Sequence, residues 1–354
     1  MLSRFGPTLA PALRTGFTQQ ASRFAPVACR QRIPCIATRK SSTHINDNFK
    51  KPSAIAERLP DPDSIHARCR LREFEFEGRV FIVTGGARGL GLTLAEALVE
   101  AGGHVYCVDR LPEPDKAFFD TQERLAHHFG GSLHYRKVDV QHAPELNAAV
   151  AEIAGEHSRL DGLVAAAGVQ RVTKALDYPA DKITEMMNIN FGGVFLSAQA
   201  CARQMVKYKT PGAMVLVGSM SGKVANRGLY CCVYNASKAA VEQLGRSLAM
   251  EWGQIIDGKP IRVNVLCPGN INTPMVQKNF EDEPHLKELW ESSNMLGRIS
   301  EPSEFRGAVL YMLSDSASFM TGSHILVDGG FTACCKSIMP HDFIIICQFP
   351  DIKE

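Results

Sequence analysis

Short apolar runs alternate with longer amphipathic segments over residues 78–332, and this alternation constrains the fold more than any other feature. The apolar runs have the length of single buried strands, whereas the segments between them have helical spacing of apolar residues. Buried strands that alternate with helices form a parallel sheet with both faces covered. The sequence therefore predicts an α/β fold, a single Rossmann-type doubly wound domain with a seven-stranded parallel sheet flanked by helices. Strands are expected at Val80–Val83, His104–Val108, Leu133–Val140, Leu163–Ala166, Ala213–Val217, Ile261–Leu266 and His324–Val327, and helices at Leu90–Ala101, Glu145–His157, Thr184–Lys207, Tyr234–Gly253 and Pro302–Ser314.

The segments that flank residues 78–332 have a different character. Residues 1–45 contain arginines but no acidic residue, and they lack the apolar run of a secretory signal. This composition predicts a mitochondrial transit-like presequence and a location in the matrix, with the cytoplasm as the alternative. A basic tail or an over-extended gene model would explain the same residues. Residues 46–77 are expected to be a linker, and residues 333–354 a C-terminal tail of unknown role.

Composition excludes several classes of function. The chain is 45% hydrophobic and 21% charged with a formal net charge of +2, which is ordinary for a globular protein. Without its basic N-terminal segment the chain is mildly acidic, which argues against a nucleic-acid partner. No apolar run reaches the roughly 18 residues of a membrane span. The 11 cysteines include no Cys-x-x-Cys pair, so neither a metal site nor a disulfide framework is expected.

A glycine-rich loop, Thr84–Gly91, joins the first expected strand to the first expected helix. Gly85, Gly89 and Gly91 let the backbone turn tightly and approach a pyrophosphate, whose charge the helix N-terminus meets. Such a loop is weak evidence alone, but here it has the strand–loop–helix context that a dinucleotide site requires. We expect these glycines to bind the cofactor together with Arg88 and Leu90.

The ends of the next two strands carry carboxylates that bear on the choice of cofactor. At Asp109 a carboxylate accepts hydrogen bonds from the adenosine ribose and repels a 2′-phosphate, which favours NAD over NADP. Arg88 and Arg110 argue the other way, since either could reach a 2′-phosphate. Asp139 and the adjacent Val140 are expected to contact the adenine. A helix N-cap or a turn is a nearly equal interpretation of Asp139.

Tyr234 and Lys238 lie four residues apart on an expected helix, so their side chains share one face. An unperturbed tyrosine is a poor acid or base at neutral pH, and a nearby cation favours the phenolate. We therefore expect Lys238 to lower the pKa of Tyr234 and make it a general acid/base. Ser219 ends the fifth strand, at the edge of the sheet where ligands bind, and is expected to orient the substrate oxygen. By itself a Tyr–Lys pair at this spacing often arises by chance and usually indicates an ordinary solvated helix face.

These motifs, in this order, resemble the short-chain dehydrogenase/reductase family. The resemblance covers about residues 78–332 and also includes Pro268-Gly269 after the sixth strand and Asp328–Gly330 after the seventh. It implies an NAD(P)-dependent oxidoreductase and a homodimer or homotetramer. It further implies that Asn190 completes a catalytic tetrad by holding a water in a proton relay. Residues Pro268, Gly269, Ile271 and Thr273 would then lie at the nicotinamide.

Two departures from the family pattern stand out. The usual Asn-Asn-Ala-Gly after the fourth strand is replaced by Ala165–Gly168, which removes amides that normally stabilise the central sheet. Ser219 and Ser221 also compete for the role of the catalytic serine. The longer loop that follows Gly222 resembles the sugar-alcohol branch and favours Ser219.

The stretches around Ser219, Tyr234 and Asn264 are similar to fungal polyol dehydrogenases that act on mannitol, arabinitol, sorbose or xylulose. The chain is thus expected to interconvert a secondary alcohol and a ketone of the polyol/ketose type. Specificity would come from a mobile, helix-containing lid over residues 273–298. A mitochondrial 3-oxoacyl thioester reductase is the alternative, although no concentrated basic patch for an acyl carrier is evident. A non-catalytic nucleotide-binding protein would be expected to lack Ser219, Tyr234 or Lys238.

Overall fold

The computed structural model describes residues 71–126, 130–226 and 228–333. The transit-like segment, most of the expected linker and nearly all of the C-terminal tail lie outside these residues. Seven parallel strands form one sheet in the order β3-β2-β1-β4-β5-β6-β7, which confirms the predicted fold class. The strands are β1 (Val80–Thr84), β2 (His104–Asp109), β3 (Ser132–Lys137), β4 (Gly162–Ala165), β5 (Ala213–Val217), β6 (Arg262–Pro268) and β7 (His324–Val327).

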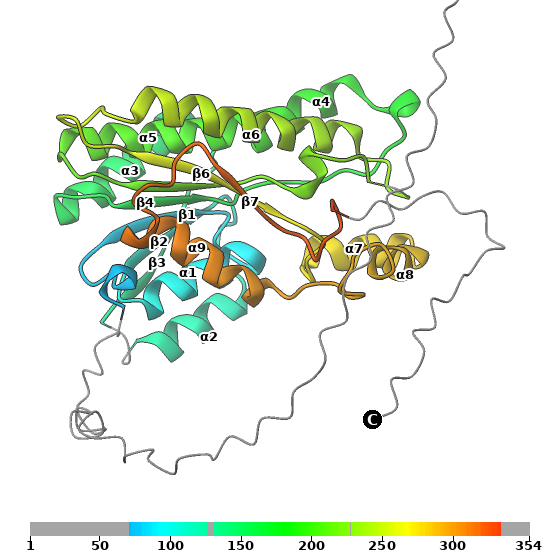
Figure 1. Cartoon of the computed structure of the whole chain (residues 1–354), viewed down its shortest axis with the longest axis horizontal. Helices are drawn as coiled ribbons and strands as arrows, with labels where there is room; N and C mark the ends of the chain where they lie inside the picture. Colours follow the sequence, from blue (N-terminus) through cyan, green and yellow to red (C-terminus); the bar gives the residue numbers. More distant parts are fainter. Residues whose placement is uncertain (1–70, 127–129, 227, 334–354) are drawn as a thin grey trace, which may run out of the picture. The chain divides into compact units, whose positions relative to one another are not determined.

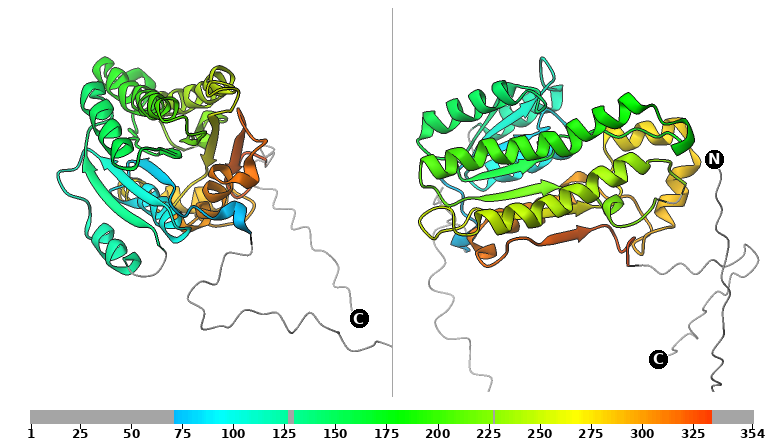
Figure 2. Two further views of the ribbon diagram at one scale, coloured as in Figure 1. Left: turned by 90° about the vertical axis from the view of Figure 1, so that its left-hand side faces the viewer. Right: turned by 90° about the horizontal axis from the view of Figure 1, so that it is seen from above.

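Helices cover both faces of the sheet (Figure 1). On one face lie α3 (Ala143–His157), α4 (Ala180–Met187), α5 (Val194–Lys207) and α6 (Cys232–Trp252). On the other lie α1 (Gly89–Glu100), α2 (Lys116–Leu125) and α9 (Arg306–Leu313). The end-on view in Figure 2 shows the twisted sheet between these two layers. Two short helices, α7 (Pro274–Asp282) and α8 (His285–Glu291), lie beyond the sheet, at one end of the molecule.

Each face of the sheet has its own apolar core, which explains why the strands were easy to recognise. All residues of β1, β4, β5 and β6 are buried, and β1, β4 and β5 read as nearly continuous apolar runs, whereas β6 also buries Arg262 and Asn264. β5 and β7 have the predicted bounds. The third strand is shorter than predicted and ends at Lys137, because the chain turns away from β2 there.

The helical expectations needed more correction. The single helix expected at Thr184–Lys207 is instead α4, a π-helical turn at Asn188–Gly193, and α5. The last expected helix opens with a 3-10 turn, Pro302–Phe305, before α9. Helix α2 was not predicted.

Packing also begins before residue 78. Phe76 has an exposed fraction of 0%, and its ring lies 5.0 Å from that of Phe81. Its backbone N–H donates to the carbonyl of Ala101. The end of the segment expected to be a linker therefore belongs to the folded domain.

The order of the strands creates a crevice beside β1. The chain passes from β1 to β2 on one side, whereas β4 pairs with β1 on the other, so the connections after β1 and β4 diverge. Ligands bind in doubly wound folds at such a switch point, beyond the carboxyl ends of the strands.

None of the helices in the described part of the chain has the length and hydropathy to cross a bilayer.

Candidate active site

A cleft of about 570 Å³ opens at the carboxyl ends of the strands. It is large enough to bury most of a ligand of cofactor size. Every residue predicted to bind the cofactor or to act in catalysis lines this cleft, except Asn190, which is fully buried behind it. The sequence motifs are thus brought together from β1, β2, β5, β6 and α6 into one site.

The glycine-rich loop has the close backbone packing that a pyrophosphate cradle needs. A Cβ on Gly85 would lie 2.8 Å from the backbone of Ala167, and a Cβ on Gly91 would lie 2.2 Å from the carbonyl oxygen of Gly85. Gly89, the first residue of α1, has a φ of +56°, a conformation that side chains disfavour. The loop can therefore fold tightly over the start of α1 and offer its N–H groups to a phosphate, so these residues fit a dinucleotide.

We predict that Gly91→Ala will abolish cofactor binding, because the new Cβ would overlap the carbonyl of Gly85 and force the loop open. Equilibrium titration with NADH and NADPH would measure this. Gly307→Ala is the matched control, since a Cβ on Gly307, also in a helix, meets no atom within 4 Å. The control should bind normally and be slightly more stable. Normal NADH binding by Gly91→Ala would contradict the assignment of the loop.

Asp109 is held rigidly beside the glycine-rich loop. Its Oδ2 accepts from the N–H of Ala87 at 3.3 Å, and its Oδ1 accepts from the N–H of Leu111 at 3.2 Å. Arg88 and Arg110 are exposed at the same end of the cleft, and Arg88 lies 3.9 Å from the carboxylate of Asp115. One fixed carboxylate and two exposed guanidinium groups thus line the same part of the cleft.

Asp139 forms a turn and does not cap a helix. Its Oδ1 accepts from the backbone N–H of Gln141 at 3.0 Å, and both of its oxygens accept from the side-chain amide of that residue. The N-cap of α3 is His142. Asp139 and Val140 line the cleft, and their contact with an adenine stays a prediction.

The catalytic candidates meet where β5 approaches α6. Lys238 Nζ donates to the carbonyl of Val217 at 2.8 Å and lies 5.8 Å from the centre of the Tyr234 ring. The side chain of Ser219 lies close enough to Tyr234 to lower the pKa of the phenol, and it also accepts from the N–H of Ser221 at 3.1 Å. Ser221 instead accepts a hydrogen bond from Asn226 through its Oγ, at 2.7 Å. Of the two serines, Ser219 therefore lies against the tyrosine.

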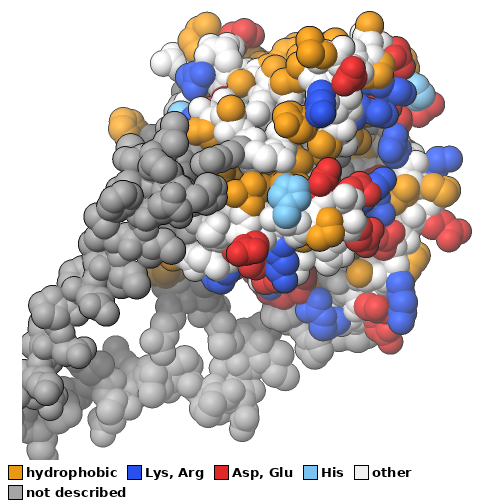
Figure 3. Space-filling model, turned by 90° about the vertical axis from the view of Figure 1, so that its right-hand side faces the viewer, with side chains coloured by type: hydrophobic (Ala, Val, Ile, Leu, Met, Phe, Trp, Pro, Cys, Tyr) orange, Lys and Arg blue, Asp and Glu red, His pale blue; other side chains and the backbone are white. Residues whose placement is uncertain are grey.

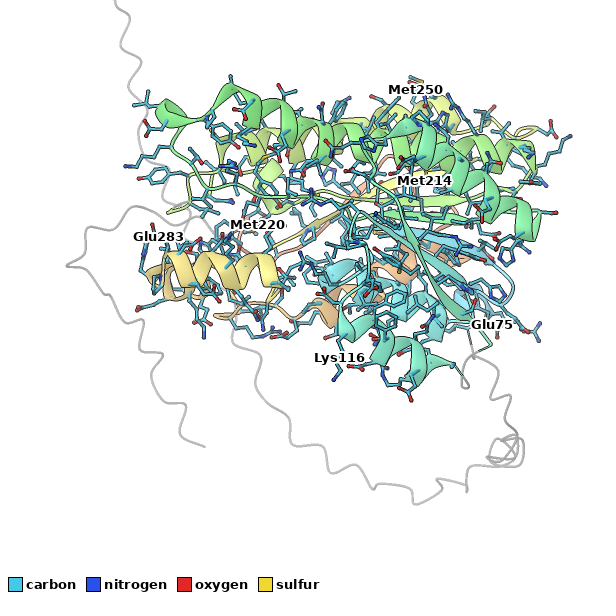
Figure 4. All side chains as sticks on the ribbon, turned by 180° about the vertical axis from the view of Figure 1, so that it is seen from behind. Glu75, Lys116, Met214, Met220, Met250 and Glu283 are labelled. Atoms are coloured by element: carbon cyan, nitrogen blue, oxygen red, sulfur yellow. The ribbon has the colours of Figure 1, made fainter. Side chains whose placement is uncertain are left out.

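In Figure 4 the neighbouring Met220 lies toward Glu283 of the α7–α8 connection, with Met214 of β5 farther along the sheet.

The expected lowering of the tyrosine pKa was wrong for this structure. Burial raises the pKa of Tyr234 to about 12, and the hydrogen bond from Ser219 only partly opposes this. Burial also lowers the pKa of Lys238 to about 8. Loss of solvent disfavours both the phenolate and the ammonium, and it is the largest influence on the pKa of each residue. At neutral pH the tyrosine therefore carries its proton and can act as an acid.

Asn190 lies in the π-helical turn between α4 and α5. Its side-chain amide makes three hydrogen bonds: Oδ1 accepts from the N–H of Val169, and Nδ2 donates to the carbonyl of Val169 and to Ser237 Oγ. Both Nδ2 protons are thus used within the protein, which leaves the backbone carbonyl of Asn190 as an acceptor for a water. A π-helical turn disturbs the regular pairing of backbone groups, and such turns are frequent at functional sites.

Residues 273–298 form the helical cover that was expected, and they pack through their apolar residues. Trp290 has an exposed fraction of 3%, and its ring lies 5.4 Å from that of Phe280. Together with Leu286 these residues pack on Leu229 and Tyr234. Met295 is exposed, so only part of the apolar lid faces inward. Figure 3 views this end of the molecule and shows charged and hydrophobic side chains interspersed on its surface.

Several polar residues of the cleft were missed in the sequence. Asn226 donates to Ser221 Oγ and to Cys231 Sγ, but its buried Oδ1 has no hydrogen-bond partner in the described structure. Gln170 also lines the cleft, and its Oε1 accepts from Asn279 of α7 at 2.8 Å. Neither Asn226 nor Gln170 belongs to a local motif that could have identified it. They lie far apart in the sequence, and only the fold places them at the cleft.

Comparisons with known proteins agree with this geometry. Residues 85–332 match the family model described as enoyl-(acyl carrier protein) reductase. A short-chain dehydrogenase/reductase of Aspergillus versicolor is 40% identical over 258 residues, which cover 73% of this chain and 88% of that protein. A galactitol 2-dehydrogenase (L-tagatose-forming) of Cereibacter sphaeroides is 37% identical, covering 73% and 97%. A ribulose-forming D-arabinitol 2-dehydrogenase of Scheffersomyces stipitis is 34% identical, covering 73% and 95%.

Solved structures show the same relationship. The crystal structure of a short-chain type dehydrogenase/reductase from Mycobacterium marinum superposes with a TM-score of 0.68 at 33% identity. The match covers 74% of this chain and 99% of that one. The chain therefore belongs to the short-chain dehydrogenase/reductase family and is a dehydrogenase that acts on a CH–OH group.

Proposed function

We propose that the protein interconverts a polyol and the corresponding ketose, with NAD as the favoured cofactor. The observation that carries this proposal is the unpaired amide oxygen of Asn226, buried in the cleft next to Ser221 and close in sequence to Ser219. A buried acceptor without a partner is costly, and a small rotation of the Asn226 side chain would let a substrate hydroxyl satisfy it. A substrate with hydroxyl groups beside the reacting carbon thus suits this cleft better than an alkyl chain. The galactitol and arabinitol dehydrogenases among the relatives support the same class.

In this proposal Tyr234 moves the proton of the reaction. The nicotinamide, when bound, supplies or accepts the hydride. In ketone reduction the O–H of Tyr234 donates its proton to the carbonyl oxygen as that oxygen becomes a hydroxyl. In alcohol oxidation the same phenol oxygen takes the proton back.

The neighbours of Tyr234 position and stabilise it. The side chain of Ser219 holds the substrate oxygen within reach of the phenol. Lys238, whose Nζ lies 5.8 Å from the centre of the Tyr234 ring, would stabilise the phenolate once the proton has left. The backbone carbonyl of Asn190 would hold the water that returns a proton.

The preference for NAD rests on Asp109. Its carboxylate is fixed by the N–H groups of Ala87 and Leu111, so it cannot turn away from a 2′-phosphate without losing both hydrogen bonds. Arg88 and Arg110 are exposed and carry no comparable constraint. Repulsion at a fixed distance should outweigh attraction by mobile, solvated cations.

The direct test is a substrate panel with both cofactors. Mannitol, arabinitol, galactitol, a simple secondary alcohol and a 3-oxoacyl thioester would each be assayed with NAD(H) and with NADP(H). We expect the highest kcat/KM for a polyol or ketose with NAD(H). Turnover of the thioester alone would overturn the substrate proposal, and a preference for NADP(H) would overturn the role of Asp109.

Asn226 offers a sharper test of the substrate class. We predict that Asn226→Leu will raise KM for polyols about tenfold or more, since one hydrogen bond to a buried group contributes about 1–3 kcal/mol. KM for a simple secondary alcohol should not rise, because that substrate has no second hydroxyl to lose. Asn147→Leu, an amide on α3 that donates to the carbonyl of Ala143, is the matched control. An equal rise in KM for both substrates would count against polyol recognition by Asn226.

Two further expectations stay predictions. Light scattering of the purified protein would test the homodimer or homotetramer. Mass spectrometry of the mature N-terminus would test import into mitochondria, where a retained Met1 would argue against a cleaved presequence.

A further inference from the structure

Helix α6 carries a third ionisable residue on the face of Tyr234 and Lys238. Glu242 follows Lys238 by four residues, so the three side chains lie one above another along the helix. Glu242 has an exposed fraction of only 5%. A carboxylate is rarely buried so deeply without a partner, and the catalytic scheme above makes no use of it.

The partner of Glu242 is Lys223, on the loop that follows Ser219. Lys223 Nζ lies 2.6 Å from Glu242 Oε2. The other carboxylate oxygen accepts from Cys267 Sγ at 3.6 Å. Burial raises the pKa of Cys267 to about 12, so its thiol keeps the proton that it donates. Both oxygens of Glu242 are therefore committed, one to the loop and one to β6.

The turn between Ser219 and Lys223 rests directly on α6. The N–H of Gly222 donates to the carbonyl of Ser219 at 3.0 Å, which closes the turn. A Cβ on Gly222 would lie 2.8 Å from Glu242 Oε1 and 2.9 Å from the backbone nitrogen of Ala239. The absence of a side chain at Gly222 thus brings the serine turn into contact with the helix, immediately after Lys238.

We propose that the buried Glu242–Lys223 ion pair is a positioning element for proton transfer, which holds the turn carrying Ser219 against the helix carrying Tyr234. This inference rests on the proposed function, because it acts through Ser219. A buried ion pair is weak evidence for stability, since apolar residues of similar size often stabilise a protein equally well. Unlike an apolar contact, the Glu242–Lys223 ion pair is directional. It therefore holds the loop against the helix in a single orientation.

Glu242→Gln is the first test, because it removes the charge and keeps the shape. We expect kcat to fall about tenfold, while the Kd for NADH and the KM for substrate stay within threefold of the wild type. Glu185→Gln is the matched control, since Glu185 forms an ion pair with Lys182 at 2.7 Å on the exposed surface of α4. It should have wild-type kinetics.

The decisive comparison repeats Glu242→Gln in a Ser219→Ala background. If Glu242 acts through Ser219, its substitution should cost nothing further once the serine hydroxyl is gone. A general structural role would give the same fold loss in both backgrounds. That equal loss, or a wild-type kcat for Glu242→Gln alone, would overturn the proposal.

A double variant guards against misfolding. Glu242→Met with Lys223→Met leaves no unpaired buried charge, so it should fold with a Tm at or above that of the wild type. We still expect its kcat to be lowered, and a wild-type kcat would overturn the positioning role. If the wild-type protein turns over no polyol or ketose, or if Ser219→Ala retains full turnover, the proposed function fails first. If the wild-type protein turns over a polyol or ketose and Ser219→Ala loses activity, then an unchanged kcat in the Glu242 variants would overturn the positioning role of Glu242 and leave the proposed function intact.

Discussion

Tyr234→Phe should lower kcat by about 10²–10⁴-fold, the range that loss of a general acid/base produces. The substitution removes only the hydroxyl, so the ring keeps its contacts with Leu229 and Trp290 in the cluster under the lid. Binding of NADH should remain within a few-fold of the wild type. Steady-state assays with the best polyol of the panel and an NADH titration would measure both quantities.

The pH dependence provides an independent check on Tyr234. Burial raises the pKa of Tyr234 to about 12, so the phenol is protonated and ready to donate throughout the physiological range. Alcohol oxidation needs the phenol oxygen as an acceptor and should become faster with rising pH in the wild type. In Tyr234→Phe this dependence should disappear with the activity. Full turnover by the variant would refute the mechanism outright.

Lys238→Met should abolish most activity and yet stabilise the protein. Burial lowers the pKa of Lys238 to about 8, whereas an unfolded lysine titrates near 10.4. The unfolded state therefore binds more protons between these two pH values, so stability rises with pH through this window. Below pH 8 the burial of the charge destabilises the fold by an amount on the order of 3 kcal/mol. Methionine removes this cost and loses only the hydrogen bond to Val217.

We accordingly expect Lys238→Met to raise Tm by several degrees at pH 7, and by less near pH 10.5, where the wild-type lysine is largely neutral. The kcat should fall by about 10²-fold or more. Thermal unfolding at both pH values and steady-state kinetics would test these effects. Lys209→Met is the matched control, since Lys209 pairs with Asp257 on the surface with 74% of its side chain exposed. A lowered Tm for Lys238→Met at pH 7 would contradict the burial argument.

Desolvation also explains why the pKa of Tyr234 is raised, although the sequence predicted that it would be lowered. Sequence spacing places Tyr234 and Lys238 on one face, and from this spacing a favourable charge effect follows. The spacing carries no information about solvent. In the folded protein Lys238 is buried and Tyr234 is partly buried, and desolvation is the largest influence on the pKa of each residue.

The sequence by itself determined the sheet, the cofactor loop and the catalytic helix. Each of these depends on local rules: continuous apolar runs in β1 and β5, glycines where Gly85 and Gly91 meet backbone, and helical spacing between Tyr234 and Lys238. Each of these rules involves only residues that are close together in the sequence, so they can be applied before the tertiary structure is known.

Only the tertiary structure decided what surrounds these groups. It placed Ser219, and not Ser221, against Tyr234, left the Oδ1 of Asn226 unpaired, and buried Glu242 against Lys223. It also divided one expected helix at Asn190 by a π-helical turn. These features depend on contacts between segments that are distant in the chain and on which groups lose water. Those contacts and that desolvation exist only once the chain has folded.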